Sequence, residues 1–389
     1  VPGAVPGDRL RISPEPGSKP PRARLLALLE PSLDRVEAAC PLAERCGGCP
    51  MMVASPELER ATKVAKIEAA LHDVPVVPRL AVEWHAAPTM LSYRRRVRLA
   101  FAAGRAQALG YRERRSHQLL DVATCPVLVA PLEAALASLR ESLLPTLRGE
   151  GEIRLAIGDR GLPVATIEAR LAQDAEGYRA AQALVDSGLF SGVALSAGGA
   201  PTPAIIGDPR EVVVAEDGLP MRAGLAGFSQ ANDAVNAALV AQAVALAEPD
   251  GAAVLELYAG AGNLTAPLAR RAERVVSIEI AQEAVAASRE NLHARQVTAK
   301  LVCGKAEDAP SGRFDVVVLD PPRAGAGEAI ARILGARPSR IVYVSCDPST
   351  LGRDLRALTT RGYRVDRACA FDMFPRTAHV EALVRLVLA

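Results

Sequence analysis

Three short polar segments of this chain carry the residue types that covalent chemistry on an electron-poor ring requires. Cys346 follows an apolar run, so a thiol is expected at the carboxyl end of a buried strand, facing a helix that Ser349 can cap. Asp320 follows another apolar run in the sequence LDPPRAG, and Glu381 precedes the last expected strand. Because open α/β sheets hold ligands at the carboxyl ends of their strands, the three side chains are expected to meet at one edge. A thiol with two carboxylates could attack a ring carbon and later remove a proton.

A glycine turn earlier in the chain predicts a nucleotide-like ligand. The segment 254–265 reads as a strand, a turn and a helix start, in which Gly260 and Gly262 let the backbone approach a ligand closely. The next expected strand ends at Glu279, whose carboxylate can accept both hydroxyls of a ribose. This pattern alone fits a dinucleotide as well as S-adenosylmethionine. Cys346 favours the second ligand, because ring methylation uses a nucleophilic thiol and hydride transfer does not.

Four of the seven cysteines predict a metal site. They are Cys40, Cys46 and Cys49 in the sequence CPLAERCGGCP, together with the distant Cys125. Four thiolates suit either a tetrahedral zinc ion or an iron–sulfur cluster, and spacing alone does not separate these alternatives. Cys303 and Cys369 lie at the ends of strand-like runs and are expected in the core.

Composition limits the class of protein. A chain of 389 residues with half of them apolar predicts two or three domains. We expect a cytoplasmic protein, because the N-terminal residues lack an apolar signal region and no long window is free of charges or prolines. The net charge is only +2, but eight arginines lie between Arg94 and Arg115 against one acidic residue, Glu113. A solvated face and a phosphate-contacting surface explain this stretch about equally well.

Hydrophobic patterning divides the chain into three parts. Residues 1–38 predict a small β-module, and residues 39–222 predict a mixed α+β domain that carries the cysteines and the arginine-rich strands. In residues 223–389 strands and helices alternate, which is typical of a doubly wound, mostly parallel sheet. Seven strands are expected there, the last two forming an antiparallel pair because their connection is short.

Taken together, these segments resemble the RNA uracil-C5 methyltransferases, class I S-adenosylmethionine enzymes that make 5-methyluridine in transfer or ribosomal RNA. The matching segments are FSQAN (228–232), ELYAGAGNLT (256–265), SIE (277–279), LDPPRAG (319–325), SCDPSTLGRDL (345–355) and FPRTAHVEAL (374–383). The four cysteines and YRRRVRLAF (93–101) resemble the family's iron–sulfur and central-domain segments. Residues 1–12 resemble the middle of the family's N-terminal TRAM β-barrel, here in shortened form.

The resemblance implies roles for particular residues. Cys346 would be the nucleophile, Glu381 the proton acceptor, and Asp320 would lie beside substrate and methyl donor. The other residues implied to line the S-adenosylmethionine site are Gln230, Tyr258, Asn263 and Glu279. Those implied to hold a 4Fe–4S cluster are Cys40, Cys46, Cys49 and Cys125. The implied partner is RNA that presents a looped or flipped uridine. We expect a monomer with no membrane contact and no obligate protein partner.

The sequence departs from the family pattern at a few positions. Asp347 stands where the family usually has Asn, Ala259 where it often has Cys, and Arg376 where many members have His. An extra carboxylate at Asp347 is expected to raise the pKa of Cys346 unless it is paired, whereas the helix start after Pro348 is expected to favour the thiolate.

Other functions remain open on the sequence. A cytosine-C5 methyltransferase would use the same addition chemistry, although a second catalytic cysteine and its flanking signatures are not found in this sequence. An inactive iron–sulfur RNA-binding protein is disfavoured because Cys346, Glu381 and Asp320 are all present. A nicotinamide-dependent oxidoreductase is the most distant alternative.

Overall fold

The computed structural model describes residues 1–104, 106–225 and 227–388. They divide into two compact units. Unit 1 comprises Val1–Thr62, Thr89–Pro209 and Phe374–Ala378, and unit 2 comprises Lys63–Pro88, Arg210–Met373 and His379–Ala389. The unit boundary falls inside helix α1 (Pro56–Leu71). Arg105 of the arginine-rich stretch lies outside the described residues.

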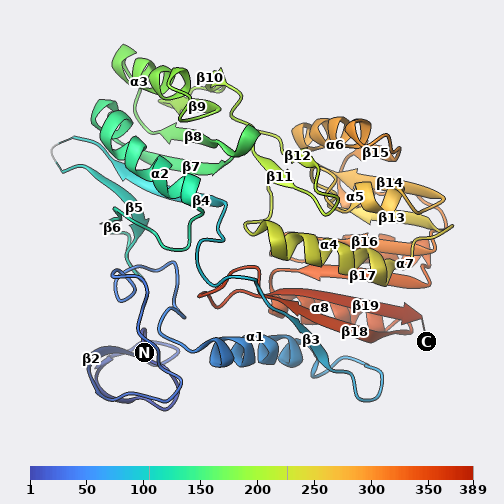
Figure 1. Ribbon diagram of the computed structural model, residues 1–389. Coiled ribbons are helices and arrows are strands. Elements are labelled where there is room, and N and C mark those ends of the chain that lie inside the picture. The colour runs from blue at the N-terminus through green and yellow to red at the C-terminus, as the bar shows by residue number, and fades with distance from the viewer. Residues whose placement is uncertain (105, 226, 389) are drawn as a thin grey trace. The chain divides into compact units, whose positions relative to one another are not determined.

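Unit 2 is built on an eight-stranded sheet with the order β15-β14-β13-β16-β17-β19-β18-β3 (Figure 1). The strands are β3 (Val82–His85), β13 (Ala253–Leu257), β14 (Arg274–Glu279), β15 (Lys300–Cys303), β16 (Val316–Leu319), β17 (Arg340–Ser345), β18 (Tyr363–Phe371) and β19 (Glu381–Leu388). The five strands from β15 to β17 pair in parallel, and β19 pairs antiparallel with both β17 and β18. Continuous apolar runs such as β16 (VVVL) form the middle of the sheet, since both faces are covered there.

Helices cover both faces of this sheet. They are α4 (Asp233–Ala247), α5 (Thr265–Ala269), α6 (Gln282–Ala294), α7 (Ala329–Ala336) and α8 (Pro348–Thr359). Side chains of α7, α8 and the second half of α1 share one core cluster with the strands, whereas α4 packs on β16, β17 and β19 from the opposite face (Figure 1). A two-stranded sheet of β11 (Val212–Val214) and β12 (Pro220–Arg222) precedes α4. The Asn232 side chain caps α4 by accepting a hydrogen bond from Val235 N.

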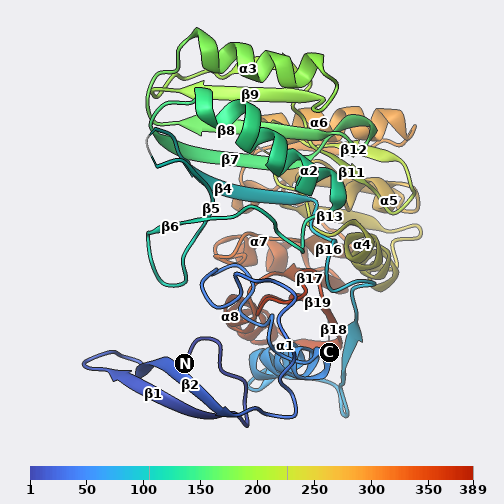
Figure 2. The same cartoon turned by 60° about the vertical axis from the view of Figure 1, so that its left-hand side comes forward.

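Unit 1 contains a seven-stranded sheet with the order β10-β9-β8-β7-β4-β5-β6. Its strands are β4 (Arg96–Ala102), β5 (Ala108–Arg112), β6 (Leu119–Asp121), β7 (Glu150–Ile157), β8 (Pro163–Ala169), β9 (Gly192–Ala197) and β10 (Ala204–Gly207). Helices α2 (Ala130–Ser138) and α3 (Ala175–Asp186) pack on this sheet and share its apolar core. Near the N-terminus, β1 (Arg9–Glu15) and β2 (Arg22–Glu30) form an antiparallel ribbon, drawn in dark blue in Figure 2.

The structure confirms the expected α/β class with its antiparallel final pair and adds details that the sequence did not predict. The sheet has eight strands where seven were expected, because the four residues of β3 pair in parallel with β18. The cap of α8 is Asp347, which accepts from Ser349 N and Thr350 N, so the prediction that Ser349 is the cap was wrong. Cys369 is buried as expected, but Cys303 is exposed.

Among the described residues, none of the helices has the length and apolarity that crossing a lipid bilayer requires.

Candidate functional site

Cys346, Asp320 and Glu381 lie at the same edge of the sheet in unit 2. Strand β16 ends one residue before Asp320 and β17 ends one residue before Cys346, and these two strands are parallel neighbours. Glu381 is the first residue of β19, which runs antiparallel to β17. The expectation that three polar segments meet at one edge therefore agrees with the strand order and register. We call these three residues the Cys346 edge.

The two carboxylates of the Cys346 edge are held in low-dielectric surroundings. Burial raises the pKa of Asp320 to about 6. The pKa of Glu381 is raised well above its usual range, first by burial and then by the charge of Asp320, and the nearby Arg323 only partly offsets this. Glu381 is 3 % exposed. Its Oε2 atom has no hydrogen-bond partner within the described part of the chain. Such an oxygen is available to a ligand.

In the protein without ligands, the ionised form of the Cys346 thiol is also disfavoured. Its pKa is raised to about 11 by burial and then by the charges of Glu381 and Asp320, against a smaller opposing effect of Arg323. The sequence suggested that the helix start would favour the thiolate, but here burial of the thiol, together with the two carboxylates, raises its pKa. A positive charge brought to this edge would be needed to reverse the balance.

Asp347 is not the cause of the raised thiol pKa. Its carboxylate Oδ1 accepts hydrogen bonds from Ser349 N at 2.9 Å and Thr350 N at 3.2 Å, at the first turn of α8. The sequence analysis expected Asp347 to raise the pKa of Cys346 only if its carboxylate were unpaired. Because these two amides pair the carboxylate, the raised pKa of Cys346 comes from other groups. The first amides of α8 therefore stabilise the carboxylate of Asp347.

A buried aspartate that the sequence analysis did not single out supports the loop after β16. Asp354 is 1 % exposed and its Oδ2 accepts hydrogen bonds from Ala326 N at 2.6 Å and from the Tyr343 hydroxyl at 2.7 Å. The neighbouring Arg353 donates to Ala324 O at 2.6 Å. An acidic residue among the apolar positions of an amphipathic helix is the sequence signal that could have identified it.

The glycine turn after β13 has the conformation that a close ligand approach requires. Tyr258, Gly260 and Gly262 have φ values of 62°, 55° and 93°. A Cβ atom on Gly262 would lie 2.8 Å from Ser288 Oγ, so this position accepts only glycine. Gly260 N donates a 2.9 Å hydrogen bond to the carboxylate of Glu279, which joins the turn to the end of β14.

The other predicted cofactor residues, Gln230, Asn263 and Tyr258, also belong to unit 2. They differ in whether their polar side-chain atoms have hydrogen-bond partners. Gln230 is 6 % exposed, and its Oε1 atom lacks a hydrogen-bond partner among the described residues. Asn263 is engaged with Asn236 through two amide hydrogen bonds of 3.2 and 2.9 Å. The Tyr258 hydroxyl donates to Ala326 O at 3.2 Å, in the same loop that Asp354 supports.

A second buried carboxylate lies beneath the glycine turn and was also missed by the sequence analysis. Glu256 accepts 2.6 Å hydrogen bonds from the hydroxyls of Thr265 and Ser277. Burial nevertheless raises its pKa to about 7, and the charges of Asp320 and Glu279 act in the same direction. This edge of the sheet therefore concentrates acidic groups, an arrangement that suits a cationic ligand.

The four predicted metal ligands come together in unit 1. Cys40, Cys46, Cys49 and Cys125 all line one small pocket. We call it the cysteine pocket. Burial raises the pKa of Cys49 to about 12, with further contributions from Cys125 and Cys46. Arg94 acts in the opposite direction on both Cys49 and Cys125, as Arg114 does on Cys46.

The spacing of the sulfurs in the cysteine pocket bears on what they could hold. Sulfurs around one zinc ion, each about 2.3 Å from it, lie roughly 4 Å apart. In the described part of the chain, a different group is the only one that brings three possible ligand atoms within 4.8 Å of one another. No three of the four sulfurs in the cysteine pocket therefore lie within 4.8 Å of one another.

The arginine-rich stretch does not form a uniform basic face. Arg98 pairs with Glu152, and Arg114 donates to Ala43 O at 2.9 Å. Arg94 lines the cysteine pocket. These three arginines therefore make contacts within unit 1.

Comparison with known proteins identifies the family. A family model described as tRNA (Uracil-5-)-methyltransferase matches residues 210–309 and 305–388. The 23S rRNA (uracil(1939)-C(5))-methyltransferase RlmD of Pectobacterium atrosepticum is 34% identical over 398 residues, covering 98% of this chain and 87% of the relative. The protein of the same name from an Enterobacter species is 35% identical, covering 99% and 90%.

A solved structure shows the same fold. The crystal structure of Pyrococcus abyssi tRNA (uracil-54, C5)-methyltransferase in complex with S-adenosyl-L-homocysteine matches with a TM-score of 0.78 and 24% identity, covering 99% of this chain and 95% of that one. The sequence matches extend over nearly the whole chain and include the segments that carry the glycine turn and the Cys346 edge. The chain therefore belongs to the family of S-adenosylmethionine-dependent RNA uracil-C5 methyltransferases.

Proposed function

We propose that this enzyme methylates C5 of one uridine in 23S ribosomal RNA through a covalent adduct on Cys346. The ribosomal substrate is favoured over transfer RNA because the relatives that match at 34–35% identity over nearly the whole chain carry 23S rRNA in their names. The single observation that carries the mechanism is the juxtaposition of a thiol with a buried carboxylate that has an oxygen unpartnered among the described residues.

The proposed chemistry assigns a separate duty to each residue of the Cys346 edge. The Cys346 thiolate adds to C6 of the uracil ring, which turns the ring into an enolate and makes C5 nucleophilic. S-adenosylmethionine supplies the methyl group that C5 accepts. Glu381 then removes the proton from C5, and elimination releases the Cys346 thiolate. The raised pKa of Glu381 makes its ionised carboxylate a stronger base than one in water, and a sulfonium nearby would favour that ionised form.

Several residues of unit 2 are proposed to hold the methyl donor. Glu279, across the turn from Gly260, would accept the ribose hydroxyls, and the free Gln230 Oε1 offers an acceptor for a polar group of the ligand. Tyr258 and Asn263 would line the same site. The acidic surroundings of Asp320 favour a cationic sulfonium, which in turn would lower the pKa of Cys346.

We further propose that the cysteine pocket holds a 4Fe–4S cluster with a structural role. Four thiols lining one pocket match the ligand number, and the wide sulfur spacing favours a cluster over one zinc ion. Arg94 and Arg114 would offset the negative charge of four thiolates. The cluster would anchor the loop 40–49 to Cys125 within unit 1. Residues 1–38, with the β1–β2 ribbon, are proposed as a shortened TRAM-like module.

The substrate can be tested with RNA from a strain that lacks this gene. Purified enzyme with labelled S-adenosylmethionine should methylate 23S rRNA from that strain, and the product should be 5-methyluridine at one position. RNA from the wild-type strain is the control, because its site is already modified. Methylation of the transfer RNA fraction alone would overturn the ribosomal assignment and leave the chemistry intact.

A further inference from the structure

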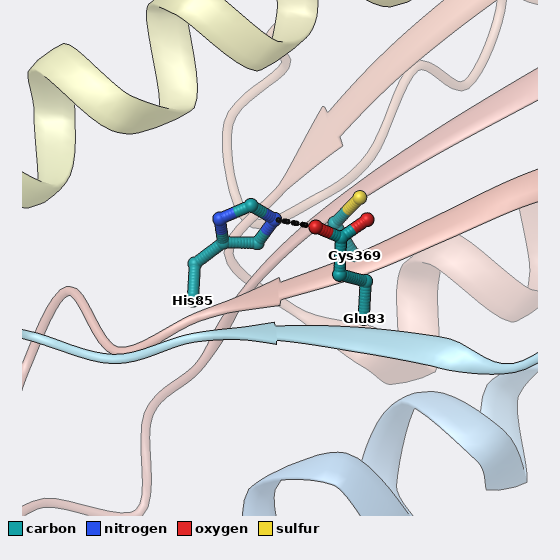
Figure 3. A group of neighbouring side chains, drawn as sticks. All are labelled: Glu83, His85 and Cys369. Carbon is teal, nitrogen blue, oxygen red and sulfur yellow. Dashed lines mark ion pairs between the residues drawn. The ribbon is translucent and has the colours of Figure 1, made fainter.

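A group of three possible metal ligands lies at the outer edge of the sheet in unit 2 (Figure 3). Glu83 and His85 belong to β3, and Cys369 belongs to the neighbouring strand β18. The parallel register pairs Cys369 with Glu83 and Phe371 with His85. A carboxylate oxygen, an imidazole nitrogen and a sulfur therefore lie within 4.8 Å of one another, the only such group in the part of the chain that the structure describes.

The polar atoms of Glu83, His85 and Cys369 lie close together but form no aligned hydrogen bonds with one another. His85 Nε2 lies 3.3 Å from Glu83 Oε1. The atom is buried, yet it makes no aligned hydrogen bond to any described residue. The Cys369 sulfur accepts a long hydrogen bond of 4.0 Å from Gln242 Nε2 of α4, and Cys369 is 1 % exposed. A buried imidazole nitrogen whose only close polar contact is an unaligned carboxylate oxygen can accept a metal ion shared with that carboxylate.

The imidazole ring is held in place by packing. It stacks on Phe371 with the ring centroids 4.2 Å apart and an interplanar angle of 9°. The His85 side chain is 22% exposed and the Glu83 side chain is 61% exposed. The group is thus pre-arranged on its buried side and accessible on its Glu83 side, so that an ion could enter from solvent (Figure 3).

We propose that Glu83, His85 and Cys369 form a zinc-binding site separate from the cysteine pocket. One nitrogen, one sulfur and one carboxylate oxygen make a donor set typical of Zn²⁺, whereas Mg²⁺ and Ca²⁺ prefer oxygen ligands throughout. On binding, the Cys369 thiol releases its proton to solvent, and water fills the remaining position on the open Glu83 side. The inference does not depend on the function proposed above.

Zinc at this site would fasten a short edge strand to its neighbour. Strand β3 has only four residues, and its sheet contacts are to β18. The ion would cross-link β3 and β18 at Cys369, two residues before Phe371. On the side of β18 away from β3, Phe371 pairs with Glu381 of β19. Because the three ligands are brought together only in the folded sheet, bound zinc should raise the stability of unit 2.

The test measures zinc binding to the full-length protein against a chromophoric chelator. Wild type is compared with His85→Gln, Cys369→Ser and Glu83→Gln, and the matched controls are Cys303→Ser and His293→Gln, which change exposed residues of the same unit. Whatever metal the cysteine pocket holds is common to all six proteins, so its contribution cancels. We expect wild type and both controls to bind one more zinc ion than His85→Gln and Cys369→Ser, whose affinity should fall at least about 100-fold.

Two further readouts separate a metal site from a packing defect. Zinc should raise the Tm of wild type and not that of His85→Gln, and the zinc absorption edge should show one sulfur with nitrogen and oxygen neighbours. Glu83→Gln changes an exposed side chain, so it should fold normally and still bind zinc more weakly. Equal zinc stoichiometry and affinity in wild type and all three site variants would overturn the proposal.

Discussion

Burial raises the pKa of thiols both in the cysteine pocket and at the Cys346 edge, but the charged groups around these two sets of thiols differ. In the cysteine pocket of unit 1, burial raises the pKa values of Cys46, Cys49 and Cys125, and neighbouring arginines act against it. At the Cys346 edge of unit 2, burial is reinforced by two carboxylates, which outweigh the opposing effects of Arg323 and of a backbone hydrogen bond. The first environment suits thiolates that a metal group neutralises, and the second suits a thiol that waits for a cationic ligand.

This difference suggests that the reactivity of Cys346 depends on the binding of a charged ligand. A reactive thiol needs a low pKa, yet a nucleophile that is permanently ionised would be open to oxidation and alkylation. Burial and the two carboxylates beside Cys346 raise its pKa and keep it protonated in the free protein. Binding of a sulfonium would supply the positive charge that these groups lack, so that activation is coupled to the presence of the methyl donor.

The largest effect is expected from removing the nucleophile. Cys346→Ala should lower methylation by at least about 10⁴-fold, because the nucleophile is lost and Cys303, which ends β15 at the same edge, is separated from β17 by three strands. Steady-state methylation of unmodified RNA measures it. Cys303→Ser, which changes an exposed cysteine of the same unit, is the control and should keep wild-type activity. Substantial turnover by Cys346→Ala would remove the covalent mechanism.

Replacing the proposed base should separate addition from release. Glu381→Gln keeps the shape of the side chain but leaves the C5 proton in place, so the thiolate cannot be expelled. Turnover should fall by about 10²- to 10⁴-fold, the range for losing a general base. A methylated RNA–protein adduct should accumulate and survive denaturing electrophoresis, and the double variant with Cys346→Ala should not form it. Release of free product at the wild-type rate would show that another group is the base.

A third experiment tests whether the methyl donor activates the thiol. The pKa of Cys346 is about 11 in the free protein, so its alkylation by iodoacetamide should accelerate as the pH rises toward that value. A sulfonium nearby should lower this pKa by about 1 to 3 pH units, making alkylation at pH 8 roughly 10 to 1000 times faster. S-adenosylhomocysteine is the matched control, because it lacks the positive charge.

Mass spectrometry of the peptide that contains Cys346 gives the rate for that thiol alone. Peptides from the cysteine pocket provide an internal reference, since their thiols should not respond to the sulfonium. Identical rates with the charged and the neutral ligand would contradict the proposed coupling.

The cysteine pocket should matter for folding of unit 1 and little for the methyl donor. Cys125→Ser should remove iron and sulfide from anaerobically purified protein and lower its Tm, because the cluster would lose one of four ligands. Binding of S-adenosylmethionine, measured by calorimetry, should change by less than about twofold. Zinc without sulfide in the wild-type protein would refute the cluster.

The fold of unit 2 was largely predictable, because strands such as β16 and β17 are continuous apolar runs with helical segments between them. The edge strand β3 was not predictable, since four residues of mixed polarity among prolines give no periodic signal. Within the site, residue types and spacing predicted roles for Cys346 and Glu381, and the register of β17 with β19 brings the two residues to one edge. They could not give the thiol's pKa, which depends on burial and on charges from separate segments.

The smallest effect is expected at Asp347, where the sequence departs from its family. The sequence suggested that this carboxylate would raise the pKa of Cys346, but it is paired with the first amides of α8. Asparagine caps helices about as well as aspartate, so Asp347→Asn should keep the helix start and change stability by less than about 0.5 kcal/mol. Methylation should stay within about twofold of wild type, and the pH dependence of Cys346 alkylation should not move. A clear shift of that profile would show that the charge reaches the thiol despite its pairing.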